Sequence, residues 1–421
     1  MRGHKRILPN WAIPALYASA AVVAAVALPR LEHAFLPPLT SGINPDAAIA
    51  LFSAVGSGMI ALTGIVFALA FLMVQFSATA YSPRLVIWLA QAPVIWHSVG
   101  LFSATFLYSL GMIAFVDRFS GNPVPFFSGW LVIALLLASV AMFIALIEKL
   151  TLLTIRRMLT FTADHGRRII AEHYPAFDTP PSTIPALPGG TPTLTLVHVG
   201  RPASLQAIDV ETLLALATGL DATIVVESLV GDTLVEGSVM VRVFGGKAAI
   251  REHPLRAAFA TGGERTFEQD PKYAIRLLVD IAIRALSPAV NDPTSAVQAL
   301  DQIEDLLRRL SRRRLEIGAW HDAGGTLRVV IPQPGWDDFL ALAFDEIRYC
   351  GATSIQVMRR MRALMADLSA YAPPERRAAI EQHRARLDAT IARSFHDEVD
   401  KREASIEDRQ GLGVPRGDHP R

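Results

Sequence analysis

Residues 47–76 read AAIALFSAVGSGMIALTGIVFALAFLMVQF, and this stretch decides the fold because it is mostly apolar and contains no Asp, Glu, Lys or Arg. An α-helix rises about 1.5 Å per residue, so the stretch would form a helix of about 45 Å. The hydrocarbon core of a bilayer is only about 30 Å thick. The stretch therefore predicts a transmembrane helix that tilts or protrudes from the bilayer.

Three further runs, 11–28, 94–116 and 126–147, also lack charged residues and have the length that crosses a bilayer. We expect about four transmembrane helices within residues 1–150. The first run has an alternative interpretation as a cleaved signal peptide, because Arg2, Lys5 and Arg6 precede it.

The basic residues that flank these runs predict the orientation, since cytoplasmic loops are enriched in Lys and Arg. One side collects seven of them and the other side two: Arg2, Lys5, Arg6, Arg84, Lys149, Arg156 and Arg157 against Arg30 and Arg118. We expect a multi-pass protein of the bacterial inner membrane, with its N-terminus and everything after residue 150 in the cytoplasm.

Small side chains form a stripe along the second run and end in a polar amide. On a helical wheel they fall within about 80° of one another: Ser53, Ser57, Ala61, Gly64, Ala68 and Gln75. Such stripes let helices approach closely, so one interpretation is packing against neighbouring helices or another subunit. The other is a pore lining. Apart from His97, the runs contain no carboxylate or histidine for a proton relay, which argues against a proton-coupled transporter.

Residues 151–192 predict a juxtamembrane helix and a Pro-rich linker, and residues 193–250 predict a small β-module. Within it, residues 231–240 resemble the Gly-Asp-x-Val-x-x-Gly turn of biotinyl and lipoyl carrier domains, which are barrel-sandwich hybrids. Lys247 stands at about the spacing of their modified lysine. The flanking sequence lacks the acidic or Met-rich context of that lysine, so we interpret the resemblance as structural and predict no cofactor.

Residues 251–400 predict a mainly helical cytoplasmic domain, in which two helices begin at Asp270-Pro271 and Asp292-Pro293. An Asp N-cap followed by Pro is a typical helix start. The fold class is thus a multi-pass α-helical membrane domain followed by an α+β cytoplasmic domain with a small β-module and a helical bundle. Residues 401–421 are polar and predict a disordered tail.

The composition excludes several classes of function. A net charge of +1 shows no basic footprint for nucleic acid. Cys350 is the only cysteine, which excludes an internal disulfide and a zinc site with several thiolates. Metalloprotease, nucleophile-elbow and phosphate-loop motifs are missing from the sequence, so we expect no metal and no enzyme.

The segment RALSPAVNDPTSA, residues 284–296, resembles a signature of the bacterial predicted membrane proteins called domain of unknown function 2254. Gln75 with Ser82, Pro83 and Arg84, and the segments 324–332 and 344–352, are similar to that family as well. The resemblance implies the architecture above and no established activity. It makes a candidate site of seven residues: Asp280, Arg284, Ser287, Pro288, Asn291, Asp292 and Pro293. Asp280 and Arg284 stand four apart and could pair on one helix face, so ion pairs and caps, a ligand site and catalysis all remain open for these residues.

Two functions follow as hypotheses. The first is an oligomeric channel-like or permeation protein with a cytoplasmic regulatory domain. The second is a membrane-anchored, non-enzymatic sensor or scaffold that binds a cytoplasmic protein or small ligand. In both, the bilayer and further copies of the chain are the expected partners.

Overall fold

A computed structural model describes residues 11–35, 44–80, 93–118, 124–150, 155–180, 189–246 and 251–412. The chain divides into two compact units, Met1–Thr154 and Ile155–Arg421. We call them the membrane unit and the C-terminal unit and describe each by itself.

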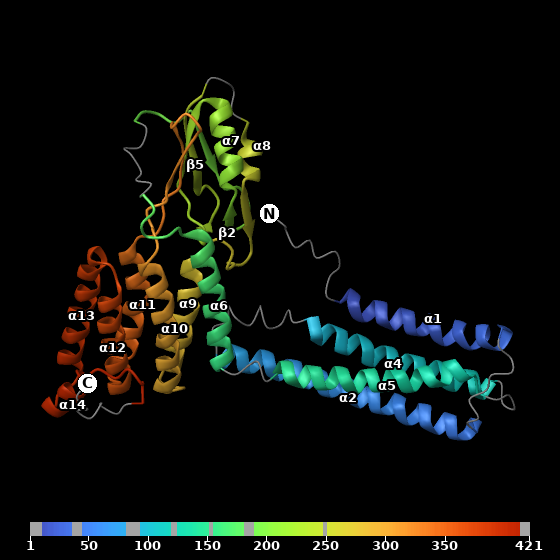
Figure 1. The fold of residues 1–421 in the computed structure, drawn as a ribbon. Helices are drawn as coiled ribbons and strands as arrows, with labels where there is room; N and C mark the ends of the chain where they lie inside the picture. Colours follow the sequence, from blue (N-terminus) through green and yellow to red (C-terminus); the bar gives the residue numbers. More distant parts are fainter. Residues whose placement is uncertain are drawn as a thin grey trace. The chain divides into compact units, whose positions relative to one another are not determined.

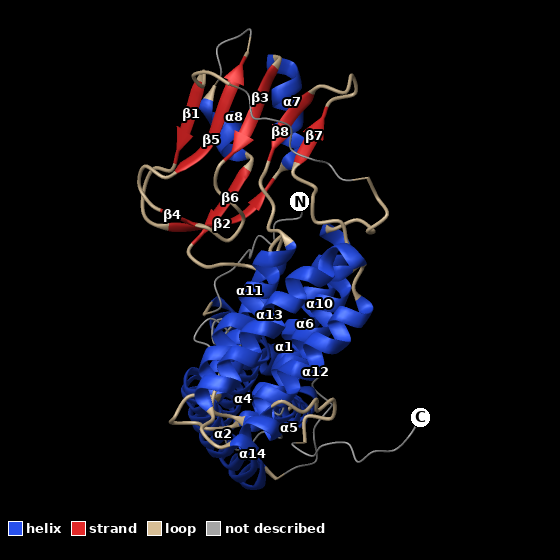
Figure 2. Ribbon diagram, turned by 90° about the vertical axis from the view of Figure 1, so that its left-hand side faces the viewer, coloured by secondary structure: helices blue, strands red, loops and turns tan. Residues whose placement is uncertain are grey.

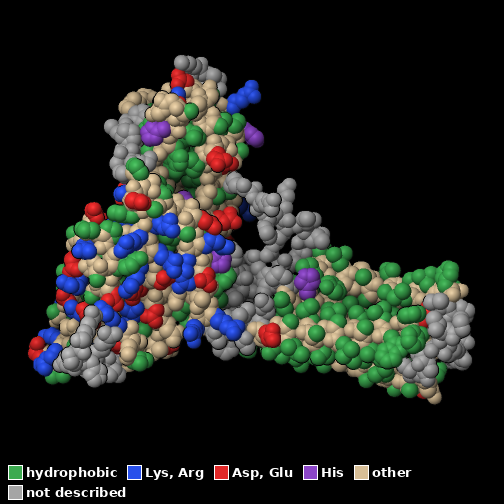
Figure 3. Space-filling model, in the orientation of Figure 1, with side chains coloured by type: hydrophobic (Ala, Val, Ile, Leu, Met, Phe, Trp, Pro, Cys, Tyr) green, Lys and Arg blue, Asp and Glu red, His purple; other side chains and the backbone are tan. Residues whose placement is uncertain are grey.

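In its described residues the membrane unit has four long helices (Figure 1): α1 (Ala12–Phe35), α2 (Pro45–Ala80), α4 (Pro93–Arg118) and α5 (Phe126–Leu150). Each is long and apolar enough to cross a membrane. Hydrophobic side chains dominate the visible surface of this unit, whereas charged side chains of both signs intersperse that of the C-terminal unit (Figure 3). A large exposed apolar surface is favourable in lipid and unfavourable in water. The prediction of about four transmembrane helices is confirmed.

Helix α4 is the centre of the membrane unit, because α1, α2 and α5 all pack against it. Phe102 and Met112 of α4 are fully buried, as is Phe52 of α2. The Thr105 and Ser139 hydroxyls lie 2.9 Å apart and join α4 to α5 by a hydrogen bond. Interhelical hydroxyl pairs of this kind supplement van der Waals packing where no hydrophobic driving force separates helix from lipid.

The C-terminal unit contains the predicted helical bundle. The helices of this bundle are α6 (Ile155–His173), α9 (Pro271–Ala285), α10 (Pro293–Ser311), α11 (Trp336–Cys350), α12 (Ile355–Tyr371), α13 (Pro374–Ser394) and α14 (Glu398–Ala404). Helices α9 and α10 begin as the sequence predicts. The Asp270 carboxylate accepts from the Tyr273 amide at 3.1 Å, and the Asp292 carboxylate accepts from the Ser295 amide at 3.1 Å.

Two sheets form the β part of this unit (Figure 2). The five-stranded sheet has the order β1-β5-β3-β8-β7, and the three-stranded sheet has the order β4-β2-β6. The strands are β1 (Leu194–Val197), β2 (Ala203–Ile208), β3 (Ala222–Val226), β4 (Thr233–Leu234), β5 (Val239–Gly245), β6 (Phe259–Gly262), β7 (Ala319–His321) and β8 (Leu327–Val330). Strand β3 pairs with β8 in parallel, with Ile224 opposite Val329. Residues 193–250 are therefore not a self-contained β-module, because the sheet is completed by strands that follow α10.

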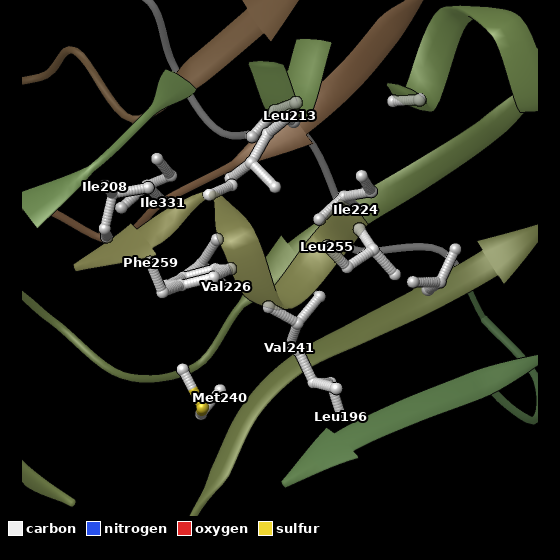
Figure 4. Close-up of a cluster of buried hydrophobic side chains, with 14 of the residues drawn as sticks. Leu196, Ile208, Leu213, Ile224, Val226, Met240, Val241, Leu255, Phe259 and Ile331 are labelled. Carbon is white, nitrogen blue, oxygen red and sulfur yellow. The ribbon is translucent and has the colours of Figure 1, made fainter. Parts of the chain in front are cut away.

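The β part has its own core between the sheets and the helices α7 (Val210–Leu220) and α8 (Glu252–Ala257). Figure 4 shows side chains from both sheets and both helices converging: Leu196, Ile208, Leu213, Ile224, Val226, Met240, Val241, Leu255, Phe259 and Ile331. Burial of each such aliphatic side chain stabilises the fold by about 1.5–3 kcal/mol.

The structure differs from the sequence-based expectation at the start of the tail. Residues 401–404 belong to α14. Asp408 is buried and accepts hydrogen bonds from the Gln410 and Gly411 amides at 3.0 and 2.9 Å. The polar composition of this segment therefore reflects local capping, at least as far as Leu412, where the described residues end.

The membrane unit offers a matched test of its helix packing. A Cβ on Gly111 of α4 would collide with the side chain of Ala25 in α1, whereas a Cβ on Gly64 of α2 would meet nothing within 4 Å. We expect Gly111→Ala to lower the free energy of unfolding by about 1–3 kcal/mol through overpacking. Gly64→Ala should leave it unchanged or raise it slightly, since Ala favours helix. Titration with dodecyl sulfate in mixed micelles, followed by circular dichroism, measures both, and equal effects would contradict the observed packing.

Candidate functional site

The small stripe on α2 lies on the outside of the membrane unit. All six residues are exposed: Ser53, Ser57, Ala61, Gly64, Ala68 and Gln75. The opposite face of α2, with Phe52, Val55, Met59 and Val66, is the one buried in the core. Among the described residues, the face of α2 that packs inside the membrane unit is therefore the one opposite the stripe.

The predicted family-motif site forms the turn between α9 and α10. The Ser287 carbonyl accepts from the Asn291 amide at 2.8 Å, and the Asp292 amide donates to the Ala285 carbonyl at 2.8 Å. Asn291 has φ of 48°, a left-handed conformation that Asn tolerates better than most residues. Pro288 is exposed, and Pro293 takes the first helical position after the Asp292 cap.

Ion pairing accounts for the acidic residue that precedes this turn. Asp280 accepts from Nε of Arg276 at 2.6 Å, and Arg276 also reaches Glu346 of α11 at 2.9 Å. The hydrogen bond from Arg276 lowers the pKa of Glu346. Arg284, the last basic residue of α9, also takes part in an interaction. The seven motif residues thus lie along α9 and its turn as pairs, caps and turn formers.

Three predicted residues of the loop motif, Ser82, Pro83 and Arg84, lie outside the described residues. The same holds for Lys247, the position that corresponds to the modified lysine of carrier domains.

A buried carboxylate that the sequence analysis did not single out fixes the entry to α5. Glu32 of α1 is only 7% exposed. It accepts from the Phe127 amide at 2.7 Å, the Ser128 amide at 3.0 Å and the Ser128 hydroxyl at 2.9 Å. The first amides of a helix have no intrahelical partner. The N-terminus is also the positive end of the helix dipole, which attracts an anion. Glu32 is therefore an N-cap supplied by another helix.

A cavity in the C-terminal unit is the second feature that the sequence did not reveal. An open groove of about 560 Å³ is lined by Arg168, Ile169, Glu172, His173, Phe267, Glu268 and Gln269. A narrow cavity of about 50 Å³ shares His173 and Gln269 with it. This narrow part lies where α6 and α9 meet the β part, and its lining includes Tyr174, Asp270, Lys272, Trp320 and Gln333.

Three side chains give the narrow cavity its chemistry. The hydroxyl of Tyr174 is buried and has no hydrogen-bond partner among the described residues. Burial raises the pKa of Tyr174, and the nearby Asp270 carboxylate raises it further. Burial lowers the pKa of His173, although its contact with Gln333 at 3.4 Å and the charge of Asp270 oppose that shift. A buried polar group without a partner calls for an explanation, and a bound water or ion is one of those that occur in native proteins.

The backbone around Gln269 holds this cavity in place. Gln269 has φ of 58°, and its side-chain amide bonds both backbone groups of Ile208, accepting from the amide at 3.0 Å and donating to the carbonyl at 3.2 Å. It thereby ties the segment before α9 to strand β2. No local sequence pattern predicts this hydrogen bond, because its partners are 61 residues apart.

Among the described residues, no group of three or more His, Cys, Asp or Glu could hold a metal ion. The described residues thus contain four membrane-length helices, a carboxylate that caps one helix from another, and a C-terminal α+β unit with a cavity. They define the class of multi-pass membrane proteins with a large C-terminal domain.

Comparison with known proteins gives the family. The model of the family described as predicted membrane protein (DUF2254) matches residues 9–367, and the chain belongs to this family, as the motif resemblance predicted. Uncharacterized proteins of Mycobacterium bovis and of Mycobacterium tuberculosis are each 28% identical over 417 residues, which cover 95% of this chain and 78% of the relative. No solved structure matches the chain.

The Glu32 cap can be tested by substitution. Glu32→Ala leaves the Phe127 amide and the buried Ser128 amide of α5 without this acceptor, so we expect it to lower the free energy of unfolding by about 2 kcal/mol. Glu32→Gln keeps one acceptor oxygen and should cost less. Glu148, on the same pair of helices but outside this contact, provides the control variant Glu148→Gln. Chemical unfolding in mixed micelles measures the series, and equal values for all three variants would contradict the cap.

Proposed function

We propose that this protein is a non-enzymatic, multi-pass protein of the bacterial inner membrane that binds a small ligand in its C-terminal unit and acts as a sensor. The C-terminal unit and the N-terminus are cytoplasmic in this proposal, supported by the distribution of basic residues around the four helices. The observation that carries it is a cavity lined by Tyr174, His173 and Asp270, where the buried Tyr174 hydroxyl has no hydrogen-bond partner in the described part of the chain.

The size and lining of the cavity support a small molecule. Ligand sites commonly occupy about 300–1,000 Å³ and combine apolar walls with a few polar groups. The groove of about 560 Å³ offers the buried rings and chains of Phe267 and Ile169 together with the polar groups of Arg168 and His173. Asp270 is paired with Arg265, which leaves Lys272 and Arg168 as donors for an anionic ligand.

The position of the cavity along α6 supports a role in signalling. His173 is the last residue of α6, and the helix begins at Ile155, five residues after Leu150 at the end of α5. A ligand that moves the end of α6 thereby acts on the element that follows the last membrane helix in the chain. The candidate carboxylates are occupied by pairs and caps, which supports binding over catalysis: Asp270, Asp280 and Asp292.

The ligand proposal predicts a specific loss of binding. We expect one or more small anions, screened as inorganic phosphate, dicarboxylates and nucleotides, to raise the unfolding temperature of the full-length protein in detergent. At 100 times its dissociation constant a ligand stabilises by about 2.7 kcal/mol. Tyr174→Phe removes one hydrogen bond and should weaken binding by about 10-fold.

The matched control is Tyr371→Phe, since Tyr371 is exposed and lies outside the cavity. Differential scanning fluorimetry over a ligand titration measures both variants. An unchanged dissociation constant in Tyr174→Phe, or no binding by any member of the panel, counts against the sensor proposal.

The exposed stripe on α2 favours a second candidate, an oligomeric channel-like protein in which stripes from several copies line a permeation path. Small side chains that face outward in one copy are suited to close contact between copies or to a path for water and ions. A Cβ on Gly64 meets nothing within 4 Å, so the surface around it is open. In this candidate the C-terminal unit regulates the path.

The channel candidate predicts that the stripe controls ion flux. In liposomes that contain the purified protein, Gly64→Trp and Gln75→Leu should change the flux of the wild type. Gly58→Trp is the matched control, because Gly58 is also exposed and open but lies about 100° away from the centre of the stripe around the helix. Absence of flux in the wild type, or equal effects of both tryptophans, would exclude the stripe as a pore lining.

A further inference from the structure

Helices α6 and α10 run parallel, which places the family-motif turn at the end of the bundle where α6 begins. Arg167 of α6 bonds Gln302 at 2.8 Å and Asp305 at 2.6 Å, and Arg313 bonds the Tyr174 carbonyl at 3.0 Å. These partners are separated by 135, 138 and 139 residues. Because the two helices are parallel, adding the same separations to 156 gives the positions nearest Arg156. These are positions 291 to 295, at the start of α10.

A second turn and the end of the described chain lie at the same place. A Cβ on Gly351, in the turn between α11 and α12, would contact Leu286 of the motif turn. Gln356 donates to the Gly411 carbonyl at 2.6 Å, and Gly411 lies against Val297 in the second turn of α10. The two similar segments that the family resemblance singled out, 284–296 and 344–352, therefore meet in space.

This end of the bundle exposes both large apolar side chains and arginines. Tyr349 is 80% exposed, Leu412 72% and Val290 46%. Arg156 and Arg157 are exposed as well. We call these five residues the turn surface. Two acids close to the turn have partners, since Asp292 caps α10 and Glu346 pairs with Arg276. The turn surface itself combines three large side chains with two positive charges.

Chain connectivity restricts what this surface can meet. Arg156 follows Leu150, the last residue of α5, by six residues, and six residues span at most about 20 Å. Exposed tyrosine, aliphatic side chains and arginines together are typical of segments that bind at a membrane interface. A protein partner could use the apolar side chains, but the tether keeps the arginines within reach of lipid headgroups.

We propose that the turn surface binds the bilayer, with Arg156 and Arg157 on anionic phospholipid headgroups and Tyr349, Val290 and Leu412 at the headgroup boundary. The family-motif turn then has a function beyond capping: its left-handed Asn291 and the Asp292 cap present Val290 to the lipid. The binding is independent of whether the protein proves to be a sensor or a channel.

The single cysteine of the chain allows a direct test, because Cys350 is exposed and follows Tyr349. A nitroxide on Cys350 of the full-length protein in nanodiscs reports its surroundings through its accessibility to oxygen and to a water-soluble nickel chelate. In phosphatidylcholine with phosphatidylglycerol we expect high oxygen and low nickel accessibility. In phosphatidylcholine alone, or in the double variant Arg156→Gln with Arg157→Gln, nickel accessibility should rise. The population ratio of lipid-bound to lipid-free turn surface should fall about 30-fold.

Two controls make the result specific. A label at Val235→Cys in a Cys350→Ser background lies directly after β4 at an exposed position and should report water in every bilayer. Neutralising exposed arginines elsewhere, with Arg201→Gln and Arg251→Gln, should leave the Cys350 label shielded. A Cys350 label that reports water in anionic nanodiscs would overturn the proposal. Shielding that is equal with and without phosphatidylglycerol would overturn the role of the headgroup charge.

Discussion

Helix ends need partners for their backbone groups, and this constraint shapes both units of the protein. In the membrane unit the Glu32 carboxylate of α1 satisfies the first amides of α5, where lipid offers none. In the C-terminal unit Asp270 and Asp292 do so within their own helices. At the far end of α10, Arg376 donates to the Leu310 carbonyl of the last turn and to the Arg313 carbonyl, the latter at 2.6 Å. Burial lowers the pKa of Arg376 to about 10, which shows the electrostatic cost of that position.

The packing of the membrane unit determines which surface is left for function. Because α1, α2 and α5 all contact α4, each of them turns one face toward α4. On α2 the small stripe lies on the exposed side, whereas Phe52, Val55, Met59 and Val66 are buried in the core. The stripe is thus available to lipid, to another copy or to a permeation path, and its exposure is what connects it to the channel candidate.

In the C-terminal unit, function is expected where segments distant in sequence meet. The cavity receives side chains from α6, from the start of α9 and from the segment after β8. Burial where these segments meet lowers the pKa of His173 and leaves the Tyr174 hydroxyl without a hydrogen-bond partner among the described residues. The turn surface lies at the other end of α6, so one helix joins a proposed ligand site to a proposed lipid contact.

The sequence by itself determined the number of membrane helices, the α+β class, the caps of α9 and α10 and the family, because runs of apolar residues, Asp-Pro starts and linear motifs are local signals. Only the tertiary structure decided that α2 turns its stripe outward, that Glu32 caps α5 and that β8 completes the sheet. The Glu32 cap and the pairing of β3 with β8 join residues about 95 or more positions apart, and no periodicity encodes which distant partner a side chain will meet. The cavity residues carry no motif for the same reason: their chemistry arises from burial, which the local sequence does not specify.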